Sequence, residues 1–196
     1  MVLVRRPSHN EIAAHLSSPE LPFSYAEVGA TNDLSSPLPE PLAATYDLDR
    51  NEFPLGTGRD VFERARDCLF AWRHFEIPWL EFHGTSNPVT PGQVVATLVS
   101  VAGIWFLNPC RVVYTEFPQD PADVAAFAYG TLRGHAERGE ERFMVTFNPT
   151  TGDVTYEIAA FSRPAILLSK LGYPFARRLQ RRFAVASAKA LARACA

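Results

Sequence analysis

The spacing of apolar residues changes twice along the chain. Between Asp60 and Glu76 they recur every three or four positions opposite charged side chains, which predicts an amphipathic helix. After Pro78 the pattern is that of strands separated by turn residues such as 108–109 and 134–139. It predicts an antiparallel meander with strands at 79–82, 93–102, 110–117, 124–132, 141–147 and 154–161. From Phe175 onward the helical repeat returns, so a long amphipathic helix is expected to close the chain.

The first sixty residues are less regular. Ser8 and Glu11 have the spacing of a capping box, so a short helix is expected to begin there. Residues 32–41 are rich in serine and proline and predict a loop, whereas 46–50 alternate like an edge strand. The expected organisation is one domain over 1–196, with an N-terminal helix or extension at 1–22 and an extended loop segment at 23–45.

The order of these elements is strand, helix, long antiparallel meander and long helix, which predicts an α+β fold. The sheet has to bury one face beneath the helices, so the expected architecture is a helix-grip fold. In it a curved antiparallel β-sheet wraps around the long C-terminal α-helix. Such a sheet leaves a concave, largely apolar space, and spaces of that kind bind small molecules.

Composition narrows the possible partners and cofactors. A hydrophobic share of 47% supports one sizeable core, and a net charge of −2 gives no general attraction to nucleic acid or to anionic membranes. No apolar run reaches the roughly 18 residues that span a bilayer, and the start lacks the apolar stretch of a signal peptide, so a cytoplasmic location is expected. The three cysteines form no cluster typical of zinc, and Gly56-Thr57-Gly58 lacks the rest of a phosphate-binding loop. We therefore expect no metal and no cofactor, and a turn at these glycines.

Several short stretches together are characteristic of a known family. They are Leu55 to Gly58, Cys110 to Tyr114, Phe127 to Leu132 with Gly134-His135, Gly139 to Phe143, and Phe161 to Pro164. With them the chain, from about Phe23 to its C-terminus, resembles the bacterial and plant family called domain of unknown function nineteen-ninety. The resemblance implies a relation to START-like, polyketide-cyclase-like (SRPBCC) helix-grip proteins and brings no reaction with it. Arg133 stands where that family often has proline, so the loop before His135 is expected to differ.

Histidine 135 is the first candidate for chemistry. It follows a glycine in a predicted loop and lies beside Glu137, Glu140 and Glu141, which would raise its pKa. His135 is then either an acid or base at the mouth of the cavity or a solvated residue at a hairpin tip. His74, in contrast, is expected on the solvent side or flank of the predicted helix.

A second group of catalytic candidates comprises Tyr129, Glu157 and Arg163. Glu157 lies in an apolar strand, where an ionised carboxylate needs a partner, and Arg163 or Arg111 could supply one. Alternation places Glu157 and Arg163 on one face of that strand. If this face is concave, the pair lies in the cavity near Tyr129 and could transfer protons in enolisation, dehydration or aldol-type cyclisation. If it is convex, the pair is solvated and Tyr156 lines the interior instead. A Glu/Arg pair that spans the barrel could also be structural rather than part of a pocket.

Aromatic residues form the predicted ligand-binding surface. In a solid core they would contact one another, and in a hollow one they would line the ligand. The candidates are Trp72, Trp105, Phe127, Phe143, Phe147, Tyr156 and Phe161.

Three functions remain open at this level. The first is binding of a mostly apolar small molecule, such as a lipid, isoprenoid or polyketide-like compound, in the cavity between sheet and helix. The second is a cofactor-free isomerase, cyclase or dehydratase that uses the same cavity. The third is an interaction module with a filled core. None involves nucleic acid or membrane insertion, and the sequence leaves the oligomeric state open.

Overall fold

One curled antiparallel sheet organises the protein. The computed structural model describes residues 1–18, 21–34, 40–84, 88–116, 123–165 and 173–196. Seven strands follow the order β2-β8-β7-β6-β5-β4-β3, and the two-residue strand β1 pairs with β5. Their bounds are Val2–Leu3 (β1), Asp47–Thr57 (β2), Leu80–His83 (β3), Val94–Val101 (β4), Ile104–Glu116 (β5), Val124–Thr131 (β6), Glu137–Phe147 (β7) and Asp153–Pro164 (β8).

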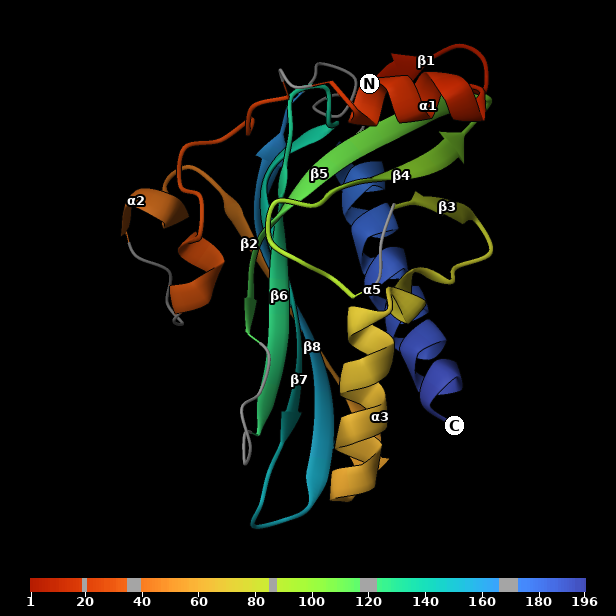
Figure 1. The fold of residues 1–196 in the computed structure, drawn as a ribbon. Helices are drawn as coiled ribbons and strands as arrows, with labels where there is room; N and C mark the ends of the chain where they lie inside the picture. Colours follow the sequence, from red (N-terminus) through yellow and green to blue (C-terminus); the bar gives the residue numbers. More distant parts are fainter. Residues whose placement is uncertain (19–20, 35–39, 85–87, 117–122, 166–172) are drawn as a thin grey trace.

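The helices lie on both sides of this sheet. They are α1 (His9–Leu16), α2 (Glu40–Ala43), α3 (Arg59–Phe70) and α5 (Tyr173–Cys195), with 3₁₀ turns η1 (Ala30–Asp33) and η2 (Arg73–Phe75). Figure 1 shows α3 and the long α5 on the concave side and the segment that carries α2 on the other side. The prediction of an α+β helix-grip fold is confirmed. Within the described ranges, no helix combines the length and apolar character needed to cross a membrane.

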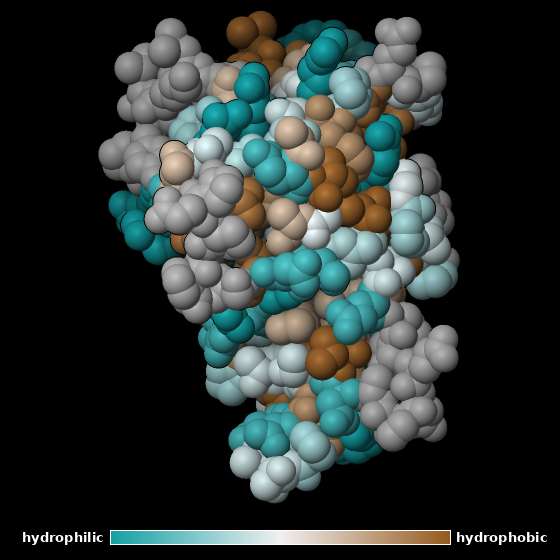
Figure 2. All heavy atoms as spheres, turned by 90° about the vertical axis from the view of Figure 1, so that its left-hand side faces the viewer, coloured by the Kyte–Doolittle hydropathy of each residue, from teal (hydrophilic) through white to brown (hydrophobic). Residues whose placement is uncertain are grey.

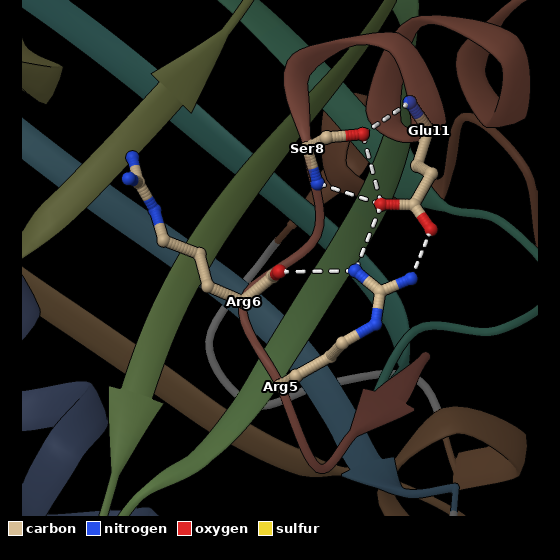
Figure 3. Close-up of polar contacts among 4 residues, drawn as sticks. All are labelled: Arg5, Arg6, Ser8 and Glu11. Carbon is tan, nitrogen blue, oxygen red and sulfur yellow. Dashed lines mark hydrogen bonds and ion pairs between the residues drawn. The ribbon is translucent and has the colours of Figure 1, made fainter.

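A capping box begins α1, as the sequence predicts. The main-chain N–H of Glu11 donates to Ser8 Oγ at 3.3 Å, and the Ser8 N–H donates to Glu11 Oε2 at 2.8 Å. The Arg5 guanidinium pairs with the same carboxylate (Figure 3). Ile12, on the buried side of α1, packs with Leu98 and Leu107 on the outer, convex face of the sheet. The capping box thus stabilises the polar start of this helix, and the apolar side of the helix packs on the sheet.

The helix predicted at 60–76 is shorter in the structure. It ends at Phe70, and Trp72 takes a left-handed conformation with φ of 61°. A bulky residue adopts that conformation only where packing holds it, and Trp72 is buried against Phe82 and Phe127. The turn sends His74 into the core, where it is fully buried. The expectation that His74 lies on the solvent side or flank of a helix was therefore wrong.

Two strands begin earlier than predicted. Strand β5 starts at Ile104, because the chain reverses at Ala102 and Gly103, which both have positive φ. Strand β7 starts at Glu137, so part of the predicted turn at 134–139 is strand. This extension places Glu137 and Glu141 on the same face of β7. It thereby supplies two of the polar groups described below.

The outer face of the sheet is also covered. Tyr25, Leu42 and Tyr46, from the N-terminal segment, are buried together with Phe161 of β8. Figure 2 looks onto this side, where hydrophobic and hydrophilic residues are interspersed. Strand β8 consequently carries apolar residues on both faces, with Tyr156 and Ile158 facing the concave core.

Candidate functional site

A cavity of about 480 Å³ lies between the concave face of the sheet and α5. Its two sides differ in chemistry. Strands β3 to β5 form a largely apolar wall with Leu80, Val99, Val101, Ile104 and Phe106, to which Thr97 and Asn108 add two polar side chains. The opposite side, called the polar end here, comprises Asp49, Tyr129, Glu137, Glu141, Ser162 and Gln180.

Strand register aligns part of the polar end in one row. Tyr129 pairs with Glu141, Glu141 with Ala160, and Ala160 with Asp49, so these residues cross β6, β7, β8 and β2 side by side. Neighbouring strands are about 4.8 Å apart, which brings the side chains of adjacent members within reach. Because Ala160 has only a methyl group, space remains between Glu141 and Asp49.

Tyr129 and Glu141 form a hydrogen-bonded pair in this row. The Tyr129 hydroxyl donates to Glu141 Oε2 at 2.7 Å. Burial raises the pKa of Glu141 to about 7; the hydrogen bond from Tyr129 opposes this effect, and the negative charges of Glu137 and Asp49 add to it. Burial also raises the pKa of Tyr129 well above its usual value, so the phenol stays protonated. Glu141 is thus a carboxyl that changes its charge near neutral pH.

Polar contacts connect α5 to the same region. Gln180 Nε2 donates to Glu137 Oε2 at 2.7 Å. Burial raises the pKa of Glu137 as well, against the effect of the hydrogen bond from Gln180. Arg177 forms a two-fold ion pair with Asp49, in which Nη2 lies 2.5 Å from Oδ1. The C-terminal helix is therefore held against β2 and β7 at the polar end.

His135 lines the cavity from the loop between β6 and β7. Its Nδ1 lies 2.9 Å from the main-chain nitrogen of Glu137 and 3.1 Å from the main-chain oxygen of the same residue, so the main chain holds the ring through this atom. Burial lowers the pKa of His135 to about 3. The prediction that neighbouring acids raise this pKa was wrong, because burial dominates and Glu140 turns its carboxylate to the outer face, where Tyr25 binds it. His135 is thus a neutral imidazole rather than a cation.

Glu157 and Arg163 share a face of β8, but it is the outer one. Glu157 is only 3% exposed and pairs with Arg50 and Arg142, each at 2.7 Å. Arg163 lies over the Tyr46 ring at 5.1 Å, and Arg111 donates to the main-chain oxygen of Leu21. Placing Glu157 and Arg163 in the cavity was therefore wrong. The acid-base hypothesis built on Glu157 is removed with it.

The seven predicted ligand-binding aromatics lie in the core or, in the case of Trp105 and Phe147, pack against it, and none of the seven is among the residues lining the cavity. Four of them, Trp72, Phe127, Phe143 and Tyr156, surround His74 on the concave side, with ring centroids of His74 and Phe143 4.8 Å apart. Phe147 packs against Phe62, and Trp105 and Phe161 belong to clusters on the outer face. This prediction was wrong because α3 and η2 fill one half of the concave space with rings. The cavity occupies the other half.

Sequence reasoning missed Asp49, Glu137, Glu141 and Gln180 as site residues. A signal existed for Glu141: it shares strand parity with Phe143, which any packing of this meander buries. A carboxylate on a buried face is costly without a purpose or a partner. Asp49 and Gln180 had no such signal, since their roles depend on how β2 and α5 meet.

Neither a metal centre nor a phosphate loop is built from these residues. Among the side chains whose positions the structure gives, no three His, Cys, Asp or Glu residues gather as a metal site requires. Gly56 and Gly58 have positive φ values of 141° and 105°, and Gly58 caps α3. Gly56 still belongs to β2, where it pairs with Val154 next to a register shift, so the predicted turn from strand to helix is at Gly58.

Comparison with known proteins gives the family and the fold. Residues 24–190 match the family described as "Domain of unknown function (DUF1990)". A "UPF0548 protein" from Dictyostelium discoideum is 32% identical over 99% of this chain and 95% of its own length. A hypothetical protein from Helicobacter pylori has a similar structure, with a TM-score of 0.58 and 12% identity over 76% of this chain and 88% of that one. The Zhui aromatase/cyclase from Streptomyces has a TM-score of 0.51 and 14% identity over 76% and 93% of the two chains. Both structures share the helix-grip fold.

Proposed function

The chain belongs to the DUF1990 family, and from the cavity within its fold we propose that it binds a mostly apolar small molecule between the sheet and the C-terminal helix. The observation that carries this proposal is the cavity of about 480 Å³ with an apolar wall and a separate polar end. This volume lies within the roughly 300 to 1,000 Å³ of small-molecule sites. Apolar walls with a few convergent polar groups are typical of such sites.

The two sides of the cavity suggest how the ligand lies. Its apolar part would pack against Val99, Ile104 and Phe106, and Phe183 of α5 would cover it. Its polar group would point toward Tyr129 and Glu141. A lipid, isoprenoid or polyketide-like compound has this division.

A neutral apolar dye tests the proposal. N-phenyl-1-naphthylamine should bind saturably with increased fluorescence. Ala160→Phe, which places a ring in the space between Glu141 and Asp49, should weaken this binding at least about tenfold. Thr155→Phe is the matched control, since Thr155 lies on the opposite face of the same strand. Unsaturable dye binding, or equal loss in both variants, would show that the cavity is not the binding site and would favour the filled-core interaction module.

A second candidate function is cofactor-free acid-base catalysis, as an isomerase, cyclase or dehydratase. The pair of Tyr129 and Glu141 favours it, because a general base is most effective when its pKa is near the working pH. Ionised Glu141 would remove a proton from the carbon atom next to a ligand carbonyl, and a hydrogen-bond donor such as His135 would stabilise the enolate oxygen.

Proton exchange tests the catalytic candidate without the natural substrate. In D₂O, 2-tetralone should exchange its α-protons for deuterium faster with the protein than in buffer, as NMR detects directly. Glu141→Gln should lower this rate about a hundredfold, since a general base contributes on the order of 10² to 10⁴. Equal exchange by wild type and Glu141→Gln would eliminate Glu141 as the base.

A further inference from the structure

Carboxylates dominate the polar end of the cavity. Asp49 comes from β2, and Glu137 and Glu141 come from the concave face of β7. The lining also includes Arg181, whose side chain is exposed. The interior of this region is therefore acidic, although the protein as a whole has a net charge of only −2.

These three carboxylates differ in how their charge is balanced. Asp49 has a full positive partner in Arg177. Glu137 accepts a hydrogen bond from the neutral amide of Gln180, and Glu141 accepts one from the neutral phenol of Tyr129. Within the described part of the chain, Tyr129 is the sole hydrogen-bond donor to Glu141, so Oε1 of Glu141 still has its acceptor capacity. The charge of Arg177 also lowers the pKa of Glu137, so Glu141 is the cavity carboxyl whose support comes from a neutral donor alone.

A cation bound at the polar end would balance the negative charge of these carboxylates. Buried carboxylates without positive partners repel one another and favour their protonated forms. A positively charged group above Ala160 would lie between Glu141 and Asp49 and would favour the ionised form of Glu141. An anionic group in the same place would add a further negative charge.

We propose that the ligand carries a positively charged nitrogen, which binds above Ala160 at the polar end while its apolar body packs against the wall formed by β3 to β5. The proposal rests on the binding function proposed above and specifies the chemical class: an apolar amine. An ammonium group offers up to three N–H donors, and Glu141 Oε1 is the first acceptor in its reach.

Titration of the free site gives this class of ligand a particular pH dependence. The groups that act on Glu141 are Tyr129 of β6, Cys110 of β5, Tyr156 of β8, Glu137 of β7 and Asp49 of β2. Burial raises the pKa of the two phenols and of the thiol well above neutrality, and Gln180 of α5 is uncharged. Among these groups Glu141 is the one whose pKa lies near 7, so an ammonium ligand should bind more tightly as pH rises through 7.

Three naphthalene probes of similar shape test the charge preference. They are 2-(1-naphthyl)ethylamine, 2-(1-naphthyl)ethanol and 1-naphthylacetate, each measured by displacement of N-phenyl-1-naphthylamine. At pH 8 the amine should bind at least about tenfold more tightly than the alcohol, and the carboxylate most weakly. Between pH 6 and 8 the affinity of the amine should rise about tenfold, because Glu141 ionises over that range, while that of the alcohol should change less than about twofold.

A variant that lacks the charge of Glu141 tests whether this residue causes the preference for the amine. Glu141→Gln should bring the affinity of the amine to within about threefold of that of the alcohol and remove its pH dependence. Glu63→Gln, which removes a carboxylate from the exposed side of α3, should leave both unchanged. An amine that binds no more tightly than the alcohol, or a carboxylate that binds most tightly, overturns the inference. If the dye itself does not bind saturably, the binding function fails; if the dye binds but the probes are not ranked by charge, only the inference about the amine fails.

Discussion

At the scale of single residues, the neighbours of a carboxyl decide what it can do. Glu141 and Glu157 are both glutamates in strands, yet their partners are a phenol in one case and two arginines in the other. Glu141 has a pKa raised to about 7 and faces an open cavity. Glu157 is held by Arg50 and Arg142 and is buried beneath the N-terminal segment. Only the first has the properties of an acid-base or ligand-binding group.

The raised pKa of Glu141 makes a testable contribution to stability. The unfolded chain ionises this carboxyl near 4.5 and the folded protein near 7, so the folded state binds more protons in between. Ionisation of Glu141 therefore lowers the free energy of unfolding as pH rises from about 4.5 to about 7. We therefore expect Glu141→Gln to stabilise the protein by on the order of 2 kcal/mol at pH 8 and by much less at pH 4.5.

Urea denaturation of wild type and Glu141→Gln at both pH values measures this effect. Taking the difference between the two proteins cancels the contributions of His74 and His135, whose pKa values burial lowers to about 3. Glu63→Gln serves as control. The same pH dependence in wild type and Glu141→Gln would mean that the carboxyl is solvated.

Removing the charge of Glu157 should destabilise the protein, in contrast to the effect expected for Glu141, and should leave dye binding intact. Its carboxylate is buried between the half-exposed Arg50 and the mostly buried Arg142, and breaking a buried pair costs about 3 to 5 kcal/mol. We expect Glu157→Gln to lower the free energy of unfolding by an amount at the low end of this range, because the amide keeps one acceptor. Affinity for N-phenyl-1-naphthylamine should stay within about twofold of wild type, since the cavity lies on the other face. Loss of dye binding by a fully folded Glu157→Gln variant would contradict this assignment.

At the scale of elements, α5 closes the concave side. Its buried face includes Ala184, Ala188 and Leu191, and Ser187 forms a 2.9 Å hydrogen bond with Tyr156 of β8. Phe183 lies at the border between this packed face and the cavity. The helix thus serves both as part of the core and as a wall of the site.

A charge at position 183 tests that role. Phe183 contacts the rings of Phe75 and Phe143, at centroid distances of 5.6 and 6.5 Å. Phe183→Asp would place an unpaired carboxylate there and should destabilise the protein by roughly 3 kcal/mol. Val185→Asp, at an exposed position of the same helix, should change the free energy of unfolding by less than about 0.5 kcal/mol. Thermal unfolding measures the effect, and equal melting temperatures for wild type and both variants would contradict the account.

Helices and strands could be predicted from the sequence where the residue pattern that defines them lies within a short stretch of the chain. The capping box at Ser8, the strand core at 141–147 and the C-terminal helix follow from spacings within a few residues. Strand ends were less predictable: Pro109 lies inside β5, opposite Ala96, although proline usually marks a turn. The left-handed turn at Trp72 depends on packing that no local pattern reveals.

At the scale of the whole molecule, the site follows from which face of the sheet is concave. Alternation correctly placed Glu157 and Arg163 on the same face of β8 but could not tell which face that is, since the N-terminal segment covers the outer side with apolar residues of its own. How the concave space is divided between α3 and the cavity likewise depends on the packing of the whole molecule and not on a local pattern. For this reason the fold could be predicted from the sequence and most site residues could not.

The central claim is that a small apolar molecule binds between the sheet and α5, and amide NMR of the ¹⁵N-labelled protein tests it most directly. Titration with N-phenyl-1-naphthylamine should shift the amide signals of Val99, Glu141 and Gln180, which come from three elements that meet only at the cavity. Signals of Leu107 and Phe161, on the outer face, should move little. Saturable shifts confined to the first group are the predicted result, and shifts confined to the outer face would contradict the account.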